Sequence, residues 1–284
     1  DVPRLARLPD IELTRRNRST LIGVVGFEFN LDRPYFRDPR VRRAFAHAID
    51  RDFIVKNIWY GYGQVATGPI PSSLAQFYTD DVPSYPYDPN KAAGLLNEAG
   101  VKPDNIGVRL SITHDPVPVG DAFARAGEYV RDALGKVGIK VALRSQDFGT
   151  FIHRVYTERD FDTIIFPANA GLDPAIGAQR LYWSKNFQPG VAFSNGSHYV
   201  YAEADRLLEA AQVEVDLARR RALYVDFQRL VQTDLPRIPL VVPDDLGRAN
   251  KRVHRLLTSG DDFASGFADA YLAGLSGTRE PFRT

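Results

Sequence analysis

The stretch from residue 108 to residue 143 has a strand–helix–strand pattern, and this pattern limits the fold class more than any other feature. Residues 108–113 and 139–143 alternate in polarity as strands do, and apolar residues recur between them at helical spacing before Gly138. Two strands joined by a helix of this length form a crossover connection between parallel strands, which is right-handed in nearly all proteins. The chain is therefore expected to have an α/β fold with a largely parallel sheet.

Further helix and strand signals surround this unit. The apolar run 21–31 is predicted to contain a buried strand, and the Asp-Pro pairs at 38–39 and 88–89 are typical of an N-cap followed by proline in the first helical turn. Frequent Gly and Pro predict a long loop over 61–87. Beyond the crossover unit, the pattern predicts a strand over 163–167, a helix from about residue 174, and helices near 202–211 and 217–233.

Composition excludes several kinds of chemistry. The 284 residues contain no Cys, so disulfides, thiolate zinc sites, iron–sulfur clusters and a cysteine nucleophile are all ruled out. They contain no Met either, and we therefore expect the chain to be a processed or truncated piece of a longer product. The net charge of +1 gives no general reason to expect a nucleic-acid partner. No apolar run approaches the roughly 18 residues that a membrane span needs.

Several segments, in order along the chain, resemble a known family. They are FNLDRPYFRDPRVRRAFAHAIDRDFIV from Phe29, GPIP from Gly68, YPYDPNKAAGLLNEAG from Tyr85, DFDTIIF from Asp160 and ARRRALYVDFQRLVQTDLPRIPLV from Ala218. This set resembles the extracellular solute-binding proteins of family 5, the oligopeptide-, dipeptide- and nickel-type receptors of ABC importers. The resemblance implies a type II-like periplasmic binding protein lobe, a mixed sheet flanked by helices, together with part of a second lobe.

The resemblance also implies a division of the chain and a biological setting. Residues 1–24 would end the first lobe, residues 25–236 would form the second lobe, and residues 237–284 would return to the first. Such a receptor works in the periplasm of a Gram-negative bacterium and delivers a small solute to the permease subunits of an importer. The first lobe would be completed by the missing N-terminal half of the same receptor. Contact with the membrane would occur only through the permease, and no nucleic acid or cofactor is expected.

The turn that follows the predicted strand 163–167 is the main candidate for ligand contact, because ligands bind outside the carboxyl ends of strands in open α/β sheets. Its candidate residues are Asn169, Ala170, Gly171 and Asp173. In peptide-binding relatives this turn carries an acid that pairs with the peptide's amino group, and the resemblance places Ala170 there. A methyl group cannot balance a desolvated ammonium, so we expect a solute other than a free peptide. Asp173 has a structural alternative as a helix cap, and Asn169 has one as a turn-stabilising side chain.

Aromatic residues at element ends are further candidates. Tyr60 and Trp183 end predicted helices, and Phe148 stands at a strand-to-helix turn. Tyr60 and Trp183 could stack on a solute or could instead seal a hydrophobic core. For Phe148 the resemblance implies a position near the ligand, since relatives often carry an aromatic residue there. Phe29 and Asn30 end the first predicted strand, at the lobe crossing that the resemblance implies. A role as hinge residues or as structural anchors is favoured there over direct contact with a solute.

The leading hypothesis is therefore a binding protein and not an enzyme. The alternative is a hydrolase or lyase that uses Asp147, Asp173 and a histidine, although no nucleophile–base spacing supports it. A third possibility is a module that only mediates interactions. The five histidines lack the helical spacing of metal ligands, so no metal site is predicted.

Overall fold

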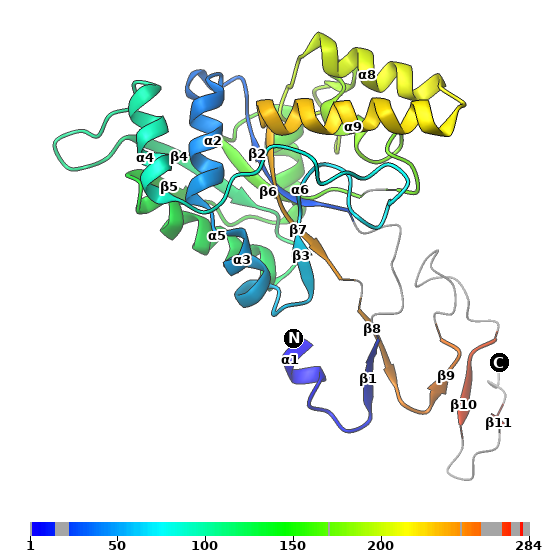
Figure 1. Ribbon diagram of the computed structural model, residues 1–284. Helices are drawn as coiled ribbons and strands as arrows, with labels where there is room; N and C mark the ends of the chain where they lie inside the picture. Colours follow the sequence, from blue (N-terminus) through cyan, green and yellow to red (C-terminus); the bar gives the residue numbers. More distant parts are fainter. Residues whose placement is uncertain are drawn as a thin grey trace.

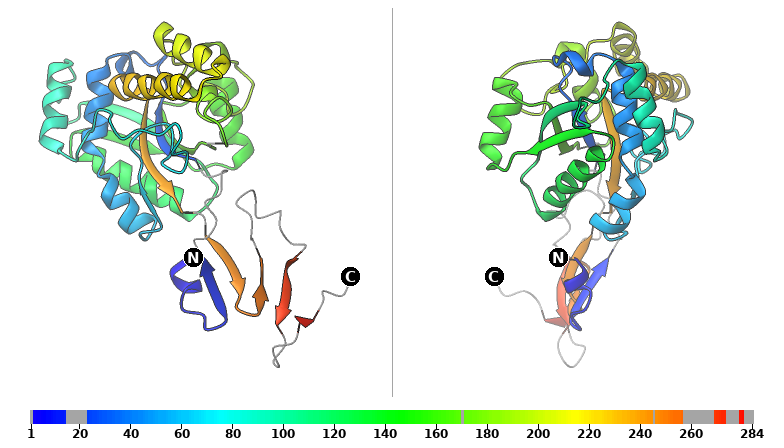
Figure 2. Two further views of the ribbon diagram at one scale, coloured as in Figure 1. Left: turned by 45° about the vertical axis from the view of Figure 1, so that its right-hand side comes forward. Right: turned by 90° about the vertical axis from the view of Figure 1, so that its left-hand side faces the viewer.

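The computed structural model describes residues 2–14, 23–169, 171–244, 246–256, 269–273 and 279–280. A large lobe of helices around one sheet lies above a small group of strands (Figure 1). A second viewpoint (Figure 2) shows this small group extending away beneath the large lobe. Its strands are β1 (Ile11–Thr14), β8 (Gly247–Asn250), β9 (Val253–His254), β10 (Tyr271–Ala273) and β11 (Arg279–Glu280), and the short helix α1 (Val2–Leu5) precedes β1.

The sheet of the large lobe has six strands. In chain order they are β2 (Val25–Phe29), β3 (Gly63–Val65), β4 (Leu110–Pro116), β5 (Ile139–Leu143), β6 (Thr163–Pro167) and β7 (Arg237–Pro243). Their spatial order is β3-β7-β2-β6-β4-β5. Strand β4 runs parallel to β5 and β6, whereas β2 runs antiparallel to β6 and β7, and β3 antiparallel to β7.

This topology confirms the predicted crossover unit, which consists of β4, α5 (Asp121–Gly135) and β5. The sheet as a whole is mixed, as the resemblance implies. It is not largely parallel, because the central strand β2 runs against both of its neighbours. A local pattern identifies a crossover between two strands but carries no information on the direction of strands that join the sheet from elsewhere in the chain.

Helices cover both faces of the sheet. On one face lie α2 (Pro39–Ala48) and α5, with α4 (Pro89–Glu98) packed against α2. On the other face lie α6 (Phe148–Ile152) and the π-helical segment η3 (His153–Glu158). Strand β6 contributes Ile165 to the first hydrophobic cluster and Ile164 and Phe166 to the second. This burial on two sides explains why 163–167 is a continuous apolar run and not an alternating one.

The predicted helix starts are confirmed where the cap is local. Asp38 accepts a hydrogen bond from the backbone N–H of Arg40 at the start of α2, and Asp88 accepts one from Lys91 at the start of α4. The two predicted helices near the end of the large lobe are α8 (Ala202–Val213) and α9 (Leu217–Asp234). The remaining short helical segments are η1 (Pro34–Phe36), α3 (Arg51–Phe53), η2 (Ile54–Ile58), α7 (Gln179–Tyr182) and η4 (Ser184–Asn186).

The structure moves the expected boundary at residue 237. Residues 237–243 form β7, which pairs with β2 and β3 and buries Ile238 and Leu240 in the core of the large lobe. The change of sheet comes later, since β8 pairs with β1 in a separate two-stranded sheet. The prediction failed because an apolar strand fits either sheet equally well, and only the pairing shows which one it joins.

Candidate functional site

Two adjoining hollows lie at the end of the large sheet from which the chain passes to the small strands. The first has a volume of about 390 Å³ and is bounded by the start of β2 at Val25, the end of β6 at Pro167 and the end of β7 at Pro243. The second has a volume of about 370 Å³. Both are lined by Trp59, Phe123 and Pro243, so the two hollows lie side by side, and together they are called the depression below.

The shared wall is aromatic. Trp59 follows η2, and its ring meets the edge of Phe123, from the first turn of α5, at a centroid distance of 5.8 Å. Tyr60 follows Trp59 in the chain; its backbone adopts the left-handed conformation (φ 53°), and its side chain is 43% exposed. Partly exposed aromatic rings of this kind can stack on a solute.

The second hollow adds charged groups and reaches the small strands. Asp121 and Arg125 line it from the first two turns of α5, while Asp244 and Arg248 line it from the end of β7 and from β8. A molecule placed there would contact both parts of the chain. Sequence reasoning missed these four residues, because no motif marks them and only the fold brings them together.

Two of the predicted ligand residues line this depression. Asn169 lies in the first hollow, beside Ala168, and Tyr60 lies in the second. The Oδ1 atom of Asn169 also accepts a hydrogen bond of 2.8 Å from the backbone N–H of Gly171, whose φ is +61°. Asn169 therefore stabilises the turn and still borders the hollow. Ala170 lies outside the described residues.

The other four predicted ligand residues line neither hollow; they are Gly171, Asp173, Phe148 and Trp183. Asp173 forms two bonds to Arg220 of α9, at 2.7 and 2.8 Å. Trp183 donates from its indole to Glu209 of α8 at 2.8 Å. Phe148 begins α6 and is 42% exposed.

The helix expected from residue 174 is also absent. The carboxylate of Asp173 accepts from the backbone N–H of Ala175, and the segment stays a series of turns until α7 begins at Gln179. The side chain that was expected to cap this helix instead connects the turn to α9 through Arg220.

Comparison with known proteins identifies the family. Residues 1–190 match the family model described as "Bacterial extracellular solute-binding proteins, family 5 Middle". The chain belongs to this family.

Individual family-5 relatives are matched over only part of their length. The chain is 30% identical over 209 residues to a di/tripeptide-binding protein 2 of Pseudomonas aeruginosa, which is 73% of this chain and 38% of that protein. It is 29% identical over 218 residues to the glutathione-binding protein GsiB of Shigella flexneri, which is 75% of this chain and 41% of that protein. The chain thus spans less than half of the length of these relatives.

A solved structure shows the same fold. The periplasmic binding protein DppA from Helicobacter pylori, in complex with the peptide STSA, superposes with a TM-score of 0.82 at 25% identity. The match covers 95% of this chain and 50% of DppA. Members of the family are solute-binding receptors, and the large lobe here is a periplasmic binding protein lobe of the type II-like class.

Within the family-5 fold, Phe29 and Asn30 do not lie where the chain passes between sheets. They stand at the opposite end of β2, where Phe29 pairs with Thr163, and both are buried. The side-chain amide of Asn30 donates to the backbone oxygen of Phe161 at 2.9 Å, and its Oδ1 accepts from Arg159 at 2.9 Å. The two residues anchor the core. The crossing lies instead before β2 and after β7, because β2 enters the large lobe at Val25.

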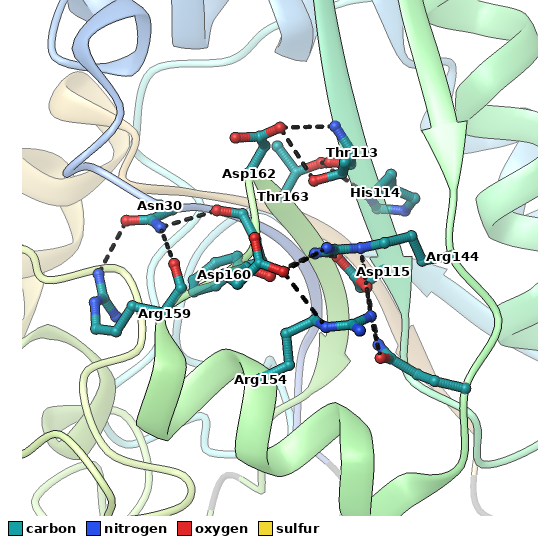
Figure 3. Close-up of polar contacts among 12 residues, drawn as sticks. Asn30, Thr113, His114, Asp115, Arg144, Arg154, Arg159, Asp160, Asp162 and Thr163 are labelled. Carbon is teal, nitrogen blue, oxygen red and sulfur yellow. Dashed lines mark hydrogen bonds and ion pairs between the residues drawn. The ribbon is translucent and has the colours of Figure 1, made fainter.

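A network of buried polar side chains lies near Asn30 and links the ends of strands of the large sheet (Figure 3). The sequence analysis did not predict it. The carboxylate of Asp115 at the end of β4 is fully buried and receives bonds from Arg144 at 2.9 and 2.7 Å and from Gln146 at 2.8 Å. Burial raises the pKa of Asp115, and the neighbouring guanidinium of Arg144 opposes that rise. Asp162 joins the same region by accepting from the hydroxyl of Tyr35 at 2.6 Å.

The catalytic alternative requires Asp147, Asp173 and a histidine to lie together, and among the described residues each of these carboxylates has a structural partner instead. Asp147 caps α6 through the N–H of Thr150, and Asp173 is held by Arg220. His114 is buried with its Nδ1 2.9 Å from Thr163 Oγ1, and burial lowers its pKa to about 3. In this part of the chain no group of three His, Asp or Glu side chains could hold a metal ion. None of the helices among the described residues combines the length and the hydropathy of a membrane-spanning segment.

Asp173 gives a direct test of the difference between a ligand contact and a structural ion pair. Replacing it with Asn is expected to reduce the free energy of unfolding by about 1 kcal/mol, because a partly exposed Arg–carboxylate pair loses its charge, while solute affinity stays unchanged. Urea unfolding and solute titration measure the two quantities. Asp226→Asn, at an exposed ion pair with Arg229, is the matched control and should change stability by less. Loss of solute binding with unchanged stability would assign Asp173 to the ligand instead.

Proposed function

We propose that the chain is part of the substrate-binding component of an ABC importer, which captures a small solute between two lobes and delivers it to the membrane permease. The observation that carries this proposal is the depression. It is lined by residues of the large lobe and of the small strands, at the place where the chain passes between them. A solute that contacts both sides only when they approach each other stabilises the closed form at the expense of the open one. The permease then recognises the closed surface.

The rest of the receptor is supplied, in this proposal, by its N-terminal half. Within the described residues β1 and β8 pair only with each other, and β9, β10 and β11 form a separate group. Such short ladders leave backbone N–H and C=O groups available for further strands. The receptor acts in the periplasm of a Gram-negative bacterium, and it has no catalytic role.

The solute is proposed to be something other than a free peptide. Support comes from the methyl side chain of Ala170, at the position where the resemblance expects an acid for the peptide's amino group. The relatives from Pseudomonas aeruginosa and Shigella flexneri are named for peptide ligands, so short peptides and glutathione belong in any binding assay.

Native mass spectrometry of the full-length receptor, purified without denaturation, tests the function. We expect a co-purifying small solute that rebinds saturably after removal and is recovered chemically unchanged. Recovery of a converted product would favour the catalytic alternative, and a receptor that binds no solute from a periplasmic extract would contradict the proposal.

The two tryptophans of the chain provide a matched test of where that solute binds. Trp59→Ala is expected to weaken solute binding at least about fivefold, because truncating an aromatic contact at the centre of an interface costs over about 1 kcal/mol. Trp183→Ala, whose side chain bonds to Glu209 away from the hollow, should leave affinity unchanged. Trp59→Phe keeps a ring in place and controls for loss of packing. The opposite ranking of the two alanine variants would place the solute elsewhere.

A further inference from the structure

Two arginines from separate parts of the fold face the same hollow. Arg125 lies on α5 of the large lobe, and Arg248 lies on β8 of the small strands. They are 123 positions apart in the sequence, so no local pattern could have paired them. The inference drawn from them rests on the proposed function and names the chemical class of the solute that this receptor would bind.

Neither guanidinium has an acidic partner in the described part of the chain. Arg125 lies over the ring of Tyr60 at 5.1 Å from its centroid and makes one long hydrogen bond, of 3.5 Å, to the backbone oxygen of Ile58. By contrast, Arg131 on the same helix pairs with Glu128 at 2.5 Å. Both Arg125 and Arg248 are exposed, so their donors remain accessible to a bound molecule.

The hollow is not uniformly positive, since Asp121 and Asp244 also line it. Asp121 lies in the first turn of α5, where the helix dipole already stabilises a negative charge. With two acidic and two basic side chains around the hollow, attraction of a charged solute at long range is weak. Recognition therefore depends on short contacts to the guanidinium groups.

We propose that Arg125 and Arg248 bind an anionic oxygen group of the solute, a carboxylate or a phosphate, from opposite sides of the hollow. A guanidinium presents a planar fork of N–H donors that matches two oxygens of such a group. The apolar first hollow, with Trp59 and Phe123 in its wall, takes the uncharged body of the same molecule. Because one arginine belongs to each part of the fold, the anionic group links solute binding to closure.

Three probes of matched size test this assignment in the full-length receptor: 3-phenylpropanoate, 3-phenylpropanamide and 2-phenylethyl phosphate. Binding is measured by titration calorimetry and by ligand-observed NMR. We expect the carboxylate or the phosphate to bind at least about tenfold more tightly than the neutral amide, since hydrogen bonds to a charged group are each worth over 1 kcal/mol. The stronger of the two anions identifies which group the site prefers. Equal binding of all three probes, or of none, contradicts the assignment.

Substitutions then show whether these two arginines are responsible. Arg125→Gln and Arg248→Gln should each weaken the anionic probe by about tenfold and leave the amide unaffected. Arg131→Gln, on the same helix but outside the hollow, is the control and should bind like the unchanged receptor. Unaltered anion binding in both hollow variants contradicts the proposal. If the natural solute still co-purifies in that case, the receptor function stands and only the anion assignment fails.

Discussion

Replacing Arg144 with Met is expected to lower the free energy of unfolding of the large lobe by about 3 kcal/mol at neutral pH, because it leaves the buried carboxylate of Asp115 without its main partner. Arg144 makes two short bonds to this carboxylate, whose side chain is 0% exposed. Gln146 and the more distant Arg154 stay in place, so the carboxylate of Asp115 keeps part of its stabilisation. Its negative charge is still buried in a protein interior that solvates ions poorly.

The effect of this substitution should depend on pH in a defined direction. Burial already raises the pKa of Asp115 in the folded lobe, and loss of Arg144 raises it further. A carboxyl group with a raised folded-state pKa opposes folding when it is ionised, so its cost is greatest at pH values above that pKa. The difference between variant and unchanged protein should therefore shrink as the pH falls and Asp115 takes up a proton.

Urea unfolding at a series of pH values measures this difference. Arg131→Met, at an exposed pair with Glu128, removes the same kind of side chain from the surface and should cost no more than about 0.5 kcal/mol. Equal unfolding midpoints for the two variants would show that the Asp115 network does not hold the sheet.

Replacing Phe29 with Ala is expected to destabilise the large lobe by about 3–5 kcal/mol, the range for truncating a buried phenylalanine. Its ring is fully buried, with centroids 5.2 Å from Phe27, 4.8 Å from Phe36 and 5.5 Å from Phe45. The cavity left behind cannot close without moving β2 or α2, since three aromatic rings surround it.

This variant also separates a core residue from a hinge residue. A core residue changes the unfolding midpoint and leaves the solute affinity of the folded protein unaltered. A hinge residue changes the balance of open and closed forms, and so changes affinity without a comparable loss of stability. Phe29→Leu retains most of the apolar volume and should cost less than about 1.5 kcal/mol. An altered affinity in Phe29→Leu at unchanged stability would restore the hinge interpretation.

Elements with local signals were predictable from the sequence. The caps at Asp38 and Asp88 bond to backbone N–H groups two or three residues away, so the sequence itself contains both partners. The same holds for the crossover unit around α5, whose strands and helix differ in the period of their apolar residues. The paired helices α8 and α9 were found for the same reason.

Predictions failed where a side chain had a distant partner. Asp173 has the sequence context of a helix cap, yet its carboxylate bonds to Arg220, 47 positions away, and no helix begins beside it. Residues 237–243 have the composition of a strand in either lobe, and only pairing with β2 assigns them to the large one. Phe29 ends a strand correctly, but the direction in which β2 enters the sheet puts that end far from the crossing.

The α/β class, the positions of the long helices and the membership of family 5 could be predicted from the sequence, because capping, periodicity and family segments all act within short stretches of chain. The depression and its lining depend on the three-dimensional arrangement of the strands and helices. Trp59, Phe123, Asn169 and Arg248 come from four separate segments, and only the fold brings them to the same depression. A binding site between lobes depends on which strand ends the sheet topology brings together, and that depends on pairings between residues too far apart for any local pattern to record.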